Sequence, residues 1–181
     1  MSMFRELRAD EIEVRVAEVY DNGVTLLLYK DARCDMSILD ETVGAGFWQR
    51  DHKMIGDVLF CSVGIYTGTS WVWKQDCGTA GNFEAEKSQA SDSFKRACFN
   101  WGIGRELYTA PRIFIPAEHV NIRQGKNGKL QCYDTFEVAK VEMEDHVIKA
   151  LAIRHQRSGK VVFTWVKKGY VPVRDRKEAT A

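Results

Sequence analysis

Basic side chains recur along one segment of the chain, between positions 82 and 101. Lys87 and Lys95 lie eight residues apart with Ser91 midway, so all three share one face if the segment is helical, and Arg96 lies about 100° further round. Lys and Arg that contact phosphate groups release counterions and bind without regard to base sequence. The spacing therefore predicts a site for the backbone of a polyanion.

The same pattern has a plainer interpretation. Cations on a helix surface are usually solvated, and Arg96 can pair with Asp92 one turn earlier. The small side chains Ser88, Ser91 and Ser93 allow a nucleic-acid strand or a neighbouring subunit to approach closely. The pattern alone leaves a binding face and an ordinary polar surface both open.

A helix from Asn82 to Trp101 is the element expected to carry these cations. Asn82 suits an N-cap, and Gly102 suits the end of the helix. Apolar residues recur at helical spacing and predict the buried face, at Ala90, Phe94, Ala97, Cys98 and Trp101.

Three strands are expected before this helix, at Phe47–Lys53, Val58–Tyr66 and Trp71–Cys77, separated by turn residues. A shorter helix is expected from Asp31 to Val43, ending at Gly44. Its predicted buried positions are Ala32, Met36, Leu39 and Val43. We therefore predict an α+β fold in which an antiparallel β-meander packs against a long helix.

Hairpins are expected on both sides of this region. Alternating residues predict paired strands at Ile12–Val16 and Val24–Tyr29. Additional C-terminal β-hairpins are expected around Gly125–Gly128 and between Val147–Arg154 and Val161–Val166. The length of 181 residues suits one domain, which we place at 1–170, followed by a flexible polar tail at 171–181.

The composition excludes several classes of protein. The formal net charge is only +1, so a polyanion site must come from the arrangement of its cations. The five cysteines form no CxxC pair, which favours reduced thiols. No segment approaches the ~20 apolar residues of a membrane span, and no signal peptide is recognisable. We expect a cytoplasmic protein without a membrane partner.

Catalysis is the main alternative to binding. A metal-dependent nuclease could use Asp76 or Asp57 with Glu84 or Glu86 and Lys87. Acidic residues at a helix start, however, already have an explanation in the helix dipole. The chain has no GxxxxGK[ST] loop for a triphosphate, and its histidines lack metal-ligand spacing. We expect no cofactor and no enzymatic activity; a purely structural oligomer is the third interpretation.

The order of residues along the basic helix resembles that of a known family. Glu84-Ala85-Glu86-Lys87, the run Ala90-Ser91-Asp92-Ser93-Phe94-Lys95-Arg96-Ala97 and Asn100-Trp101-Gly102 resemble the Rad-fifty-two/Rad-twenty-two family of single-strand annealing proteins, including phage and bacterial relatives. A short helix with Arg33, the Gly44-Ala45-Gly46 join, Trp48 and the meander fit the same pattern. The resemblance covers about Tyr29 to Tyr108.

The resemblance implies a function. Family members form closed homo-oligomeric rings and hold single-stranded DNA in a groove, backbone inward and bases exposed. It implies ATP-independent annealing of complementary strands in homologous recombination and DNA repair, in a bacterial or phage-infected cell. The implied partners are single-stranded DNA, further copies of the chain and a single-strand binding protein. Lys95, Arg96 and Arg33 resemble groove contacts, whereas Phe99 stands where another cation is common.

Further residues of the meander could extend this groove. Arg50 and Lys74, like Lys53, could add phosphate contacts or form a second DNA site, although each is alone on its strand. Trp71 and Trp73 point to one face of a strand. Stacking on bases is one interpretation of the pair, and burial in the core or in a subunit interface is the preferred one.

Overall fold

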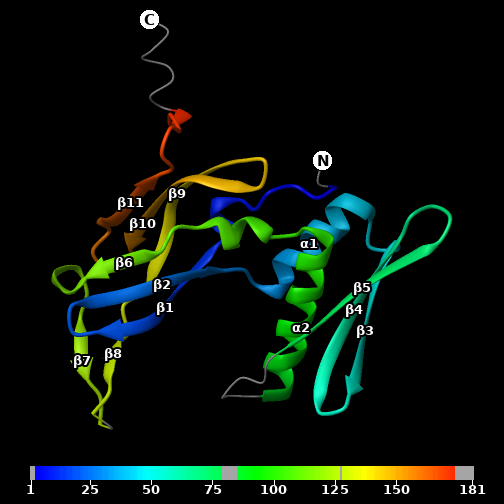
Figure 1. The fold of residues 1–181 in the computed structure, drawn as a ribbon, viewed down its shortest axis with the longest axis horizontal. Helices are drawn as coiled ribbons and strands as arrows, with labels where there is room; N and C mark the ends of the chain where they lie inside the picture. The colour runs from blue at the N-terminus through cyan, green and yellow to red at the C-terminus, as the bar shows by residue number, and fades with distance from the viewer. Residues whose placement is uncertain (1–2, 79–84, 127, 174–181) are drawn as a thin grey trace, which may run out of the picture. The chain divides into compact units, whose positions relative to one another are not determined.

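The computed structural model describes residues 3–78, 85–126 and 128–173, and within them it shows an α+β fold with two α-helices and antiparallel strands (Figure 1). The prediction of this fold class is confirmed. Contacts divide the chain into two compact units. Unit 1 comprises Met1–Glu6 and Lys30–Arg105, and unit 2 comprises Leu7–Tyr29 and Glu106–Ala181.

Unit 1 is built on the predicted meander. Its strands are β3 (Trp48–Ile55), β4 (Val58–Tyr66) and β5 (Trp71–Cys77), paired in that order. Helix α1 (Ala32–Val43) precedes them and helix α2 (Ala85–Trp101) follows. Helix α2 packs against β4 and β5, while α1 contacts α2 and β3 (Figure 1).

The core of unit 1 lies between the sheet and α2. One face of β4 is apolar because its side chains alternate, as the sequence predicted. From α2, the predicted positions Phe94, Ala97 and Cys98 are buried, while Ala90 and Trp101 are half-buried. The buried apolar side chains from α1, β4 and the region of α2 are Ile38, Leu39, Cys61, Val63, Ile65, Phe94, Ala97, Cys98 and Ile103.

The buried face of α1 differs from the predicted one. Leu39 is buried as expected, but Ala32, Met36 and Val43 are only half-buried, and Asp35 and Ile38 take the interior positions. Asp35 is accommodated because the ammonium group of Lys30, itself buried, contacts its carboxylate. The periodicity of apolar residues could not reveal this pair, since neither member is apolar.

Side chains fasten α2 to the sheet. The indole N–H of Trp101 donates to the carbonyl of Val63 at 3.0 Å, and the Asn100 amide donates to the carbonyl of Gln75 at 2.9 Å. At the other end of the helix, Nε2 of His52 lies 3.1 Å from the Ala90 carbonyl oxygen. The predicted cap Asn82 and Glu84 lie outside the described residues.

Unit 2 contains a six-stranded sheet in the order β11-β10-β9-β1-β2-β6, antiparallel at every pair (Figure 1). Strands β7 and β8 form a separate hairpin. The strands are β1 (Glu13–Tyr20), β2 (Gly23–Tyr29), β6 (Ile113–Pro116), β7 (Ile122–Gln124), β8 (Leu130–Cys132), β9 (Phe136–Glu144), β10 (Val147–His155) and β11 (Val161–Val166). Short 3-10 helices lie at Ala9–Glu11, Arg105–Thr109 and Ala117–His119.

Three of these hairpins match the sequence prediction, namely β1–β2, β7–β8 and β10–β11. Strands β6 and β9 were not predicted. Strand β9 pairs with both β10 and β1, and therefore joins the two hairpins into one sheet. The buried apolar residues of the sheet include Val24, Leu26, Leu28, Ile113, Ile115, Phe136, Ile148, Leu151 and Ile153.

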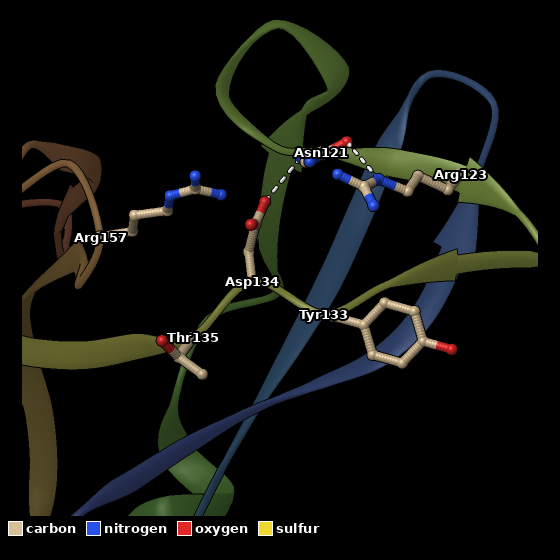
Figure 2. Close-up of a pocket in the computed structure, with 6 residues that line it drawn as sticks. All are labelled: Asn121, Arg123, Tyr133, Asp134, Thr135 and Arg157. Carbon is tan, nitrogen blue, oxygen red and sulfur yellow. Dashed lines mark hydrogen bonds between the residues drawn. The ribbon is translucent and has the colours of Figure 1, made fainter.

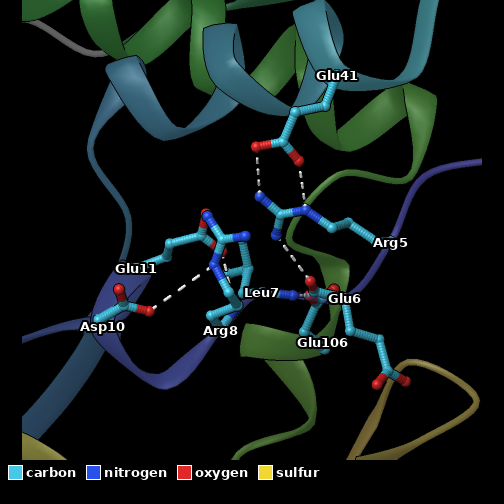
Figure 3. A network of polar contacts seen from close by, with 8 residues as sticks. All are labelled: Arg5, Glu6, Leu7, Arg8, Asp10, Glu11, Glu41 and Glu106. Atoms are coloured by element: carbon cyan, nitrogen blue, oxygen red, sulfur yellow. Dashed lines mark hydrogen bonds and ion pairs between the residues drawn. The ribbon is translucent and has the colours of Figure 1, made fainter.

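Carboxylates fix the chain near its N-terminus in each unit separately (Figure 3). In unit 1, Arg5 forms an ion pair with Glu41 of α1, with Nε 2.7 Å from Oε2. In unit 2, the backbone N–H of Leu7 donates to the buried Glu106 carboxylate at 2.7 Å, and Arg8 pairs with Glu11 at 2.9 Å.

The sequence predicted no membrane-spanning segment, and it predicted a polar tail at the C-terminal end. Among the described residues, no helix is long and apolar enough to cross a membrane. The expected tail begins at 171, and positions 174–181 lie outside the described residues. Within the described part, the Val173 N–H donates to the carboxylate of Glu142 at 3.0 Å.

Candidate nucleic-acid interface

Arg33 lies in the first turn of α1, where Asp31 is the N-cap. The Asp31 carboxylate accepts the backbone N–H of Arg33 at 2.7 Å and also holds its guanidinium group, with Nη2 at 2.6 Å from Oδ2. The hydrogen bonds from Arg33 keep the pKa of Asp31 below its ordinary value, so it stays ionised. The Arg33 side chain is nevertheless 85% exposed, so solvent or a ligand can reach it.

Lys95 of α2 acts on the same carboxylate through its charge. This charge helps to lower the pKa of Asp31, after the larger effect of Arg33, and also acts on Asp35. Helices α1 and α2 are in contact, and Lys95 is on the side of α2 that faces α1. Asp31 is therefore in direct contact with Arg33 and within the electrostatic influence of Lys95.

Arg96 occupies a different side of α2. Its Nε lies 3.4 Å from Oδ1 of Asp76 on β5, and 43% of its side chain is exposed. Consecutive helical residues point about 100° apart, so Lys95 and Arg96 diverge although they are adjacent in sequence. The pair is thus divided between an α1 side, with Lys95, and a β5 side, with Arg96.

Arg50 and Lys74 lie on the face of the sheet that carries α2. Both align with Val63 in the strand register, from opposite sides. The guanidinium carbon of Arg50 is 4.8 Å from the centre of the Phe94 ring. Lys74 Nζ is 2.9 Å from the carbonyl oxygen of Asn100 and 4.5 Å from the centre of the Trp101 ring. Both cations thus cover aromatic residues of α2.

Lys74 also acts at the C-terminal end of α2, where backbone carbonyls lack helical partners. Arg105 donates to the carbonyls of Phe99 and Asn100 at 2.5 and 2.9 Å. Two cations therefore cap this helix end, where the helix dipole favours positive charge. Lys87 lies within α2, but its side chain is outside what the structure describes.

The opposite face of the same sheet carries a row of aromatic rings. Phe47, Tyr66, Trp71 and Trp73 follow one another with centroid separations of 6.3, 5.6 and 6.1 Å. Trp71 and Trp73 are 39% and 45% exposed, so they are not part of the core between the sheet and α2. Gly64 on β4 makes room for the indole of Trp73, because a Cβ there would lie 2.8 Å from Cε3.

The structure describes only some of the residues that a nuclease site would use. The Asp76 carboxylate contacts Arg96 and accepts the backbone N–H of Cys77 at 2.8 Å. Glu84 lies outside the described residues, as do the side chains of Glu86 and Lys87. Among the residues that are described, no group of three or more His, Cys, Asp or Glu side chains is arranged to hold a metal ion.

The partners of two carboxylates were not predicted from the sequence. Asp31 was expected as the first residue of the short helix and is its N-cap, and nothing in the spacing indicates its contact with Arg33 or the influence of Lys95. Asp76 is 20 residues from Arg96, so no local pattern links them. Comparison with protein-family models, with curated proteins and with solved structures finds no match.

Proposed function

We propose that the protein binds single-stranded DNA through unit 1 and anneals complementary strands without ATP, as a homo-oligomeric ring. The observation that carries this proposal is the exposed Arg33 guanidinium at Asp31, a carboxylate on which the charge of Lys95 also acts, with Arg96 on another side of α2. The resemblance of the Lys95-Arg96-Ala97 helix to single-strand annealing proteins supports it.

The cations are held in place by carboxylates before any ligand binds. Asp31 restrains Arg33 and Asp76 restrains Arg96. Exposed ion pairs of this kind contribute only ~0–1 kcal/mol, so a phosphate can replace the carboxylate as a partner at little cost. Restraint of the long side chains also reduces the conformational entropy lost on binding.

Annealing requires that phosphate repulsion between two strands is reduced while the bases remain able to pair. Contacts to phosphate meet the first requirement and read no base sequence. Base pairing then supplies the specificity. Repetition of the site around an oligomer would make individually weak contacts strong together.

The test is the affinity for a fluorescent oligothymidine, measured by anisotropy across a series of salt concentrations. Lys95→Ala and Arg33→Ala should each weaken binding and reduce the salt slope by about 0.7 for each phosphate that is no longer neutralised. Lys53→Ala is the matched control, because Lys53 is exposed on β3, on the sheet face opposite α2. Equal behaviour of the Lys95 and Lys53 variants would contradict the proposal.

The ring is tested separately by light scattering and negative-stain imaging. We expect a particle of several subunits that persists in Lys95→Ala, because the charge is not a packing residue. A monomer that anneals strands fully would refute the ring and leave the DNA contacts standing.

A further inference from the structure

Unit 2 contains a surface pocket of about 260 Å³, at a place that no sequence pattern indicated (Figure 2). It is lined by Asn121, Arg123, Tyr133, Asp134, Thr135 and Arg157. Its walls come from strand β7 and the residue before it, the link between β8 and β9, and the turn after β10. The volume is slightly below the ~300–1,000 Å³ of pockets for whole small molecules, so it suits one chemical group of a larger ligand.

Two guanidinium groups face each other across this pocket. Figure 2 shows Arg157 and Arg123 extending inward from opposite sides, with the Asp134 carboxylate between them. Nε of Arg123 donates to the Asn121 side-chain oxygen at 3.3 Å. Among the described residues, Arg157 makes no hydrogen bond, ion pair or ring contact, so its guanidinium has no protein partner to compete with a ligand.

The turn that presents Arg157 is well ordered by hydrogen bonds. The Ser158 hydroxyl lies 2.8 Å from Nδ1 of the buried His155, and the Ser158 backbone N–H donates to the same nitrogen at 3.2 Å. The Gln156 N–H donates to the Thr135 carbonyl at 3.0 Å, which fastens the turn to the opposite wall. These hydrogen bonds restrain the backbone on both sides of Arg157.

The Asp134 carboxylate contributes a negative charge to the pocket and so affects which anion can bind there. Its Oδ2 accepts the Asn121 backbone N–H at 2.6 Å, and its Oδ1 lies 3.5 Å from Nε2 of His155. The carboxylate therefore belongs to the wall, and with the two arginines it gives the pocket a formal charge of 2 − 1 = +1. A singly charged phosphodiester neutralises this charge, whereas a doubly charged phosphate monoester would leave an excess negative charge beside Asp134.

The two guanidinium groups suit an anion with two acceptor oxygens. A phosphodiester has two anionic oxygens, and each can accept hydrogen bonds from one guanidinium group. Tyr133 lines the same pocket as Arg123, and the residue is 76% exposed. An exposed aromatic ring beside a phosphate site offers a surface on which a base can stack.

We propose that this pocket binds a phosphodiester group of a nucleic-acid strand between Arg157 and Arg123, with Tyr133 stacked on a neighbouring base. The inference extends the proposed function by adding a second nucleic-acid contact, carried by unit 2. It does not depend on Lys95 or Arg96, so either site can fail without the other.

The test measures anisotropy of a fluorescent oligothymidine with the full chain, both in wild type and in a Lys95→Ala, Arg96→Ala background. Arg157→Ala and Arg123→Ala should each weaken binding roughly fivefold or more in both backgrounds, the effect of losing about 1 kcal/mol. Lys160→Ala removes the same charge from the same exposed turn, outside the pocket, and should change affinity less than about twofold. Equal affinities of the Arg157 and Lys160 variants would overturn the proposal.

Two further measurements sharpen this result. Ultraviolet cross-linking to oligothymidine should join thymine to Tyr133, and cross-links confined to unit 1 would contradict the pocket. In competition, the dinucleotide d(TpT) should displace the labelled strand more effectively than inorganic phosphate. Stronger displacement by inorganic phosphate would overturn the assignment to a diester and indicate that the pocket binds a free anion. Arg157→Lys, which retains the charge, should restore part of the affinity and so exclude misfolding as the cause.

Discussion

The guanidinium group of Arg96 on α2 lies 3.4 Å from the carboxylate of Asp76 on β5. A basic residue expected to hold DNA and an acidic residue considered for metal-dependent cleavage therefore neutralise each other in the structure. Because the two residues are in contact, a single substitution at Asp76 can distinguish DNA binding from metal-dependent cleavage.

Asp76→Asn should increase the affinity for single-stranded DNA, because it releases Arg96 from a competing carboxylate. The side-chain oxygen of Asn can still accept the Cys77 N–H. An exposed ion pair is worth at most ~1 kcal/mol, so we expect an increase of up to about fivefold at low salt, measured by anisotropy. Unchanged binding, together with Mg²⁺-dependent cleavage that this variant abolishes, would favour the nuclease.

Lys74→Met distinguishes a structural cation from a DNA contact. Lys74 donates to the Asn100 carbonyl and covers the Trp101 ring. Its loss should lower the free energy of unfolding by about 1 kcal/mol in urea denaturation and leave DNA affinity nearly unchanged. A variant of normal stability that binds DNA several-fold more weakly would instead place Lys74 in the groove.

The buried Lys30–Asp35 pair should make stability depend on pH. Burial raises the pKa of Asp35 to about 6, although Lys30 acts in the opposite direction. A carboxyl whose pKa is higher in the folded than in the unfolded protein binds its proton more tightly in the fold. Its contribution to stability is therefore fully present below the unfolded pKa, and for Asp35 it is lost as pH rises through about 6. The contribution is roughly 1.4 kcal/mol for each unit of pKa difference.

Asp35→Asn removes this titration and leaves Lys30 without its buried charge partner. In urea denaturation, the free energy of unfolding of the wild type minus that of the variant should be more positive near pH 4.5 than near pH 7.5. These two values lie about one unit or more on either side of the Asp35 pKa. A difference that is constant across this range would show that Asp35 does not titrate there.

Gly64→Ala tests the packing of the aromatic row. The new methyl group would lie 2.8–2.9 Å from three atoms of the Trp73 indole, so the ring must move. Overpacking of this kind costs ~1–3 kcal/mol in the free energy of unfolding. Gly46→Ala is the matched control, because a Cβ there meets nothing within 4 Å. Equal stability of the two variants would mean that Trp73 does not pack on Gly64.

The sequence predicted the elements of unit 1 well because their signals are local. Strands β4 and β5 have the predicted bounds, and α1 ends at Gly44, whose φ of 89° suits glycine. Strand β9 was not predicted. It lies between β10 and β1 in the sheet, and the alternation of its own residues does not show which strands it pairs with.

The contacts of the site were less predictable than its elements. Lys95 and Arg96 are adjacent in sequence but act on different carboxylates. Lys95 influences Asp31 at the start of α1, and Arg96 forms an ion pair with Asp76 on β5. Arg123 and Arg157 line one pocket only because the fold of unit 2 places them there. Such pairings depend on tertiary packing, which no spacing along the chain encodes.

The central claim is tested most directly by the rate at which complementary oligonucleotides anneal, followed by fluorescence energy transfer without ATP or Mg²⁺. The wild-type chain and Lys53→Ala should accelerate annealing equally, whereas Lys95→Ala combined with Arg33→Ala should fall close to the spontaneous rate. Annealing at the spontaneous rate with wild-type protein, or full acceleration by the double variant, would contradict the account.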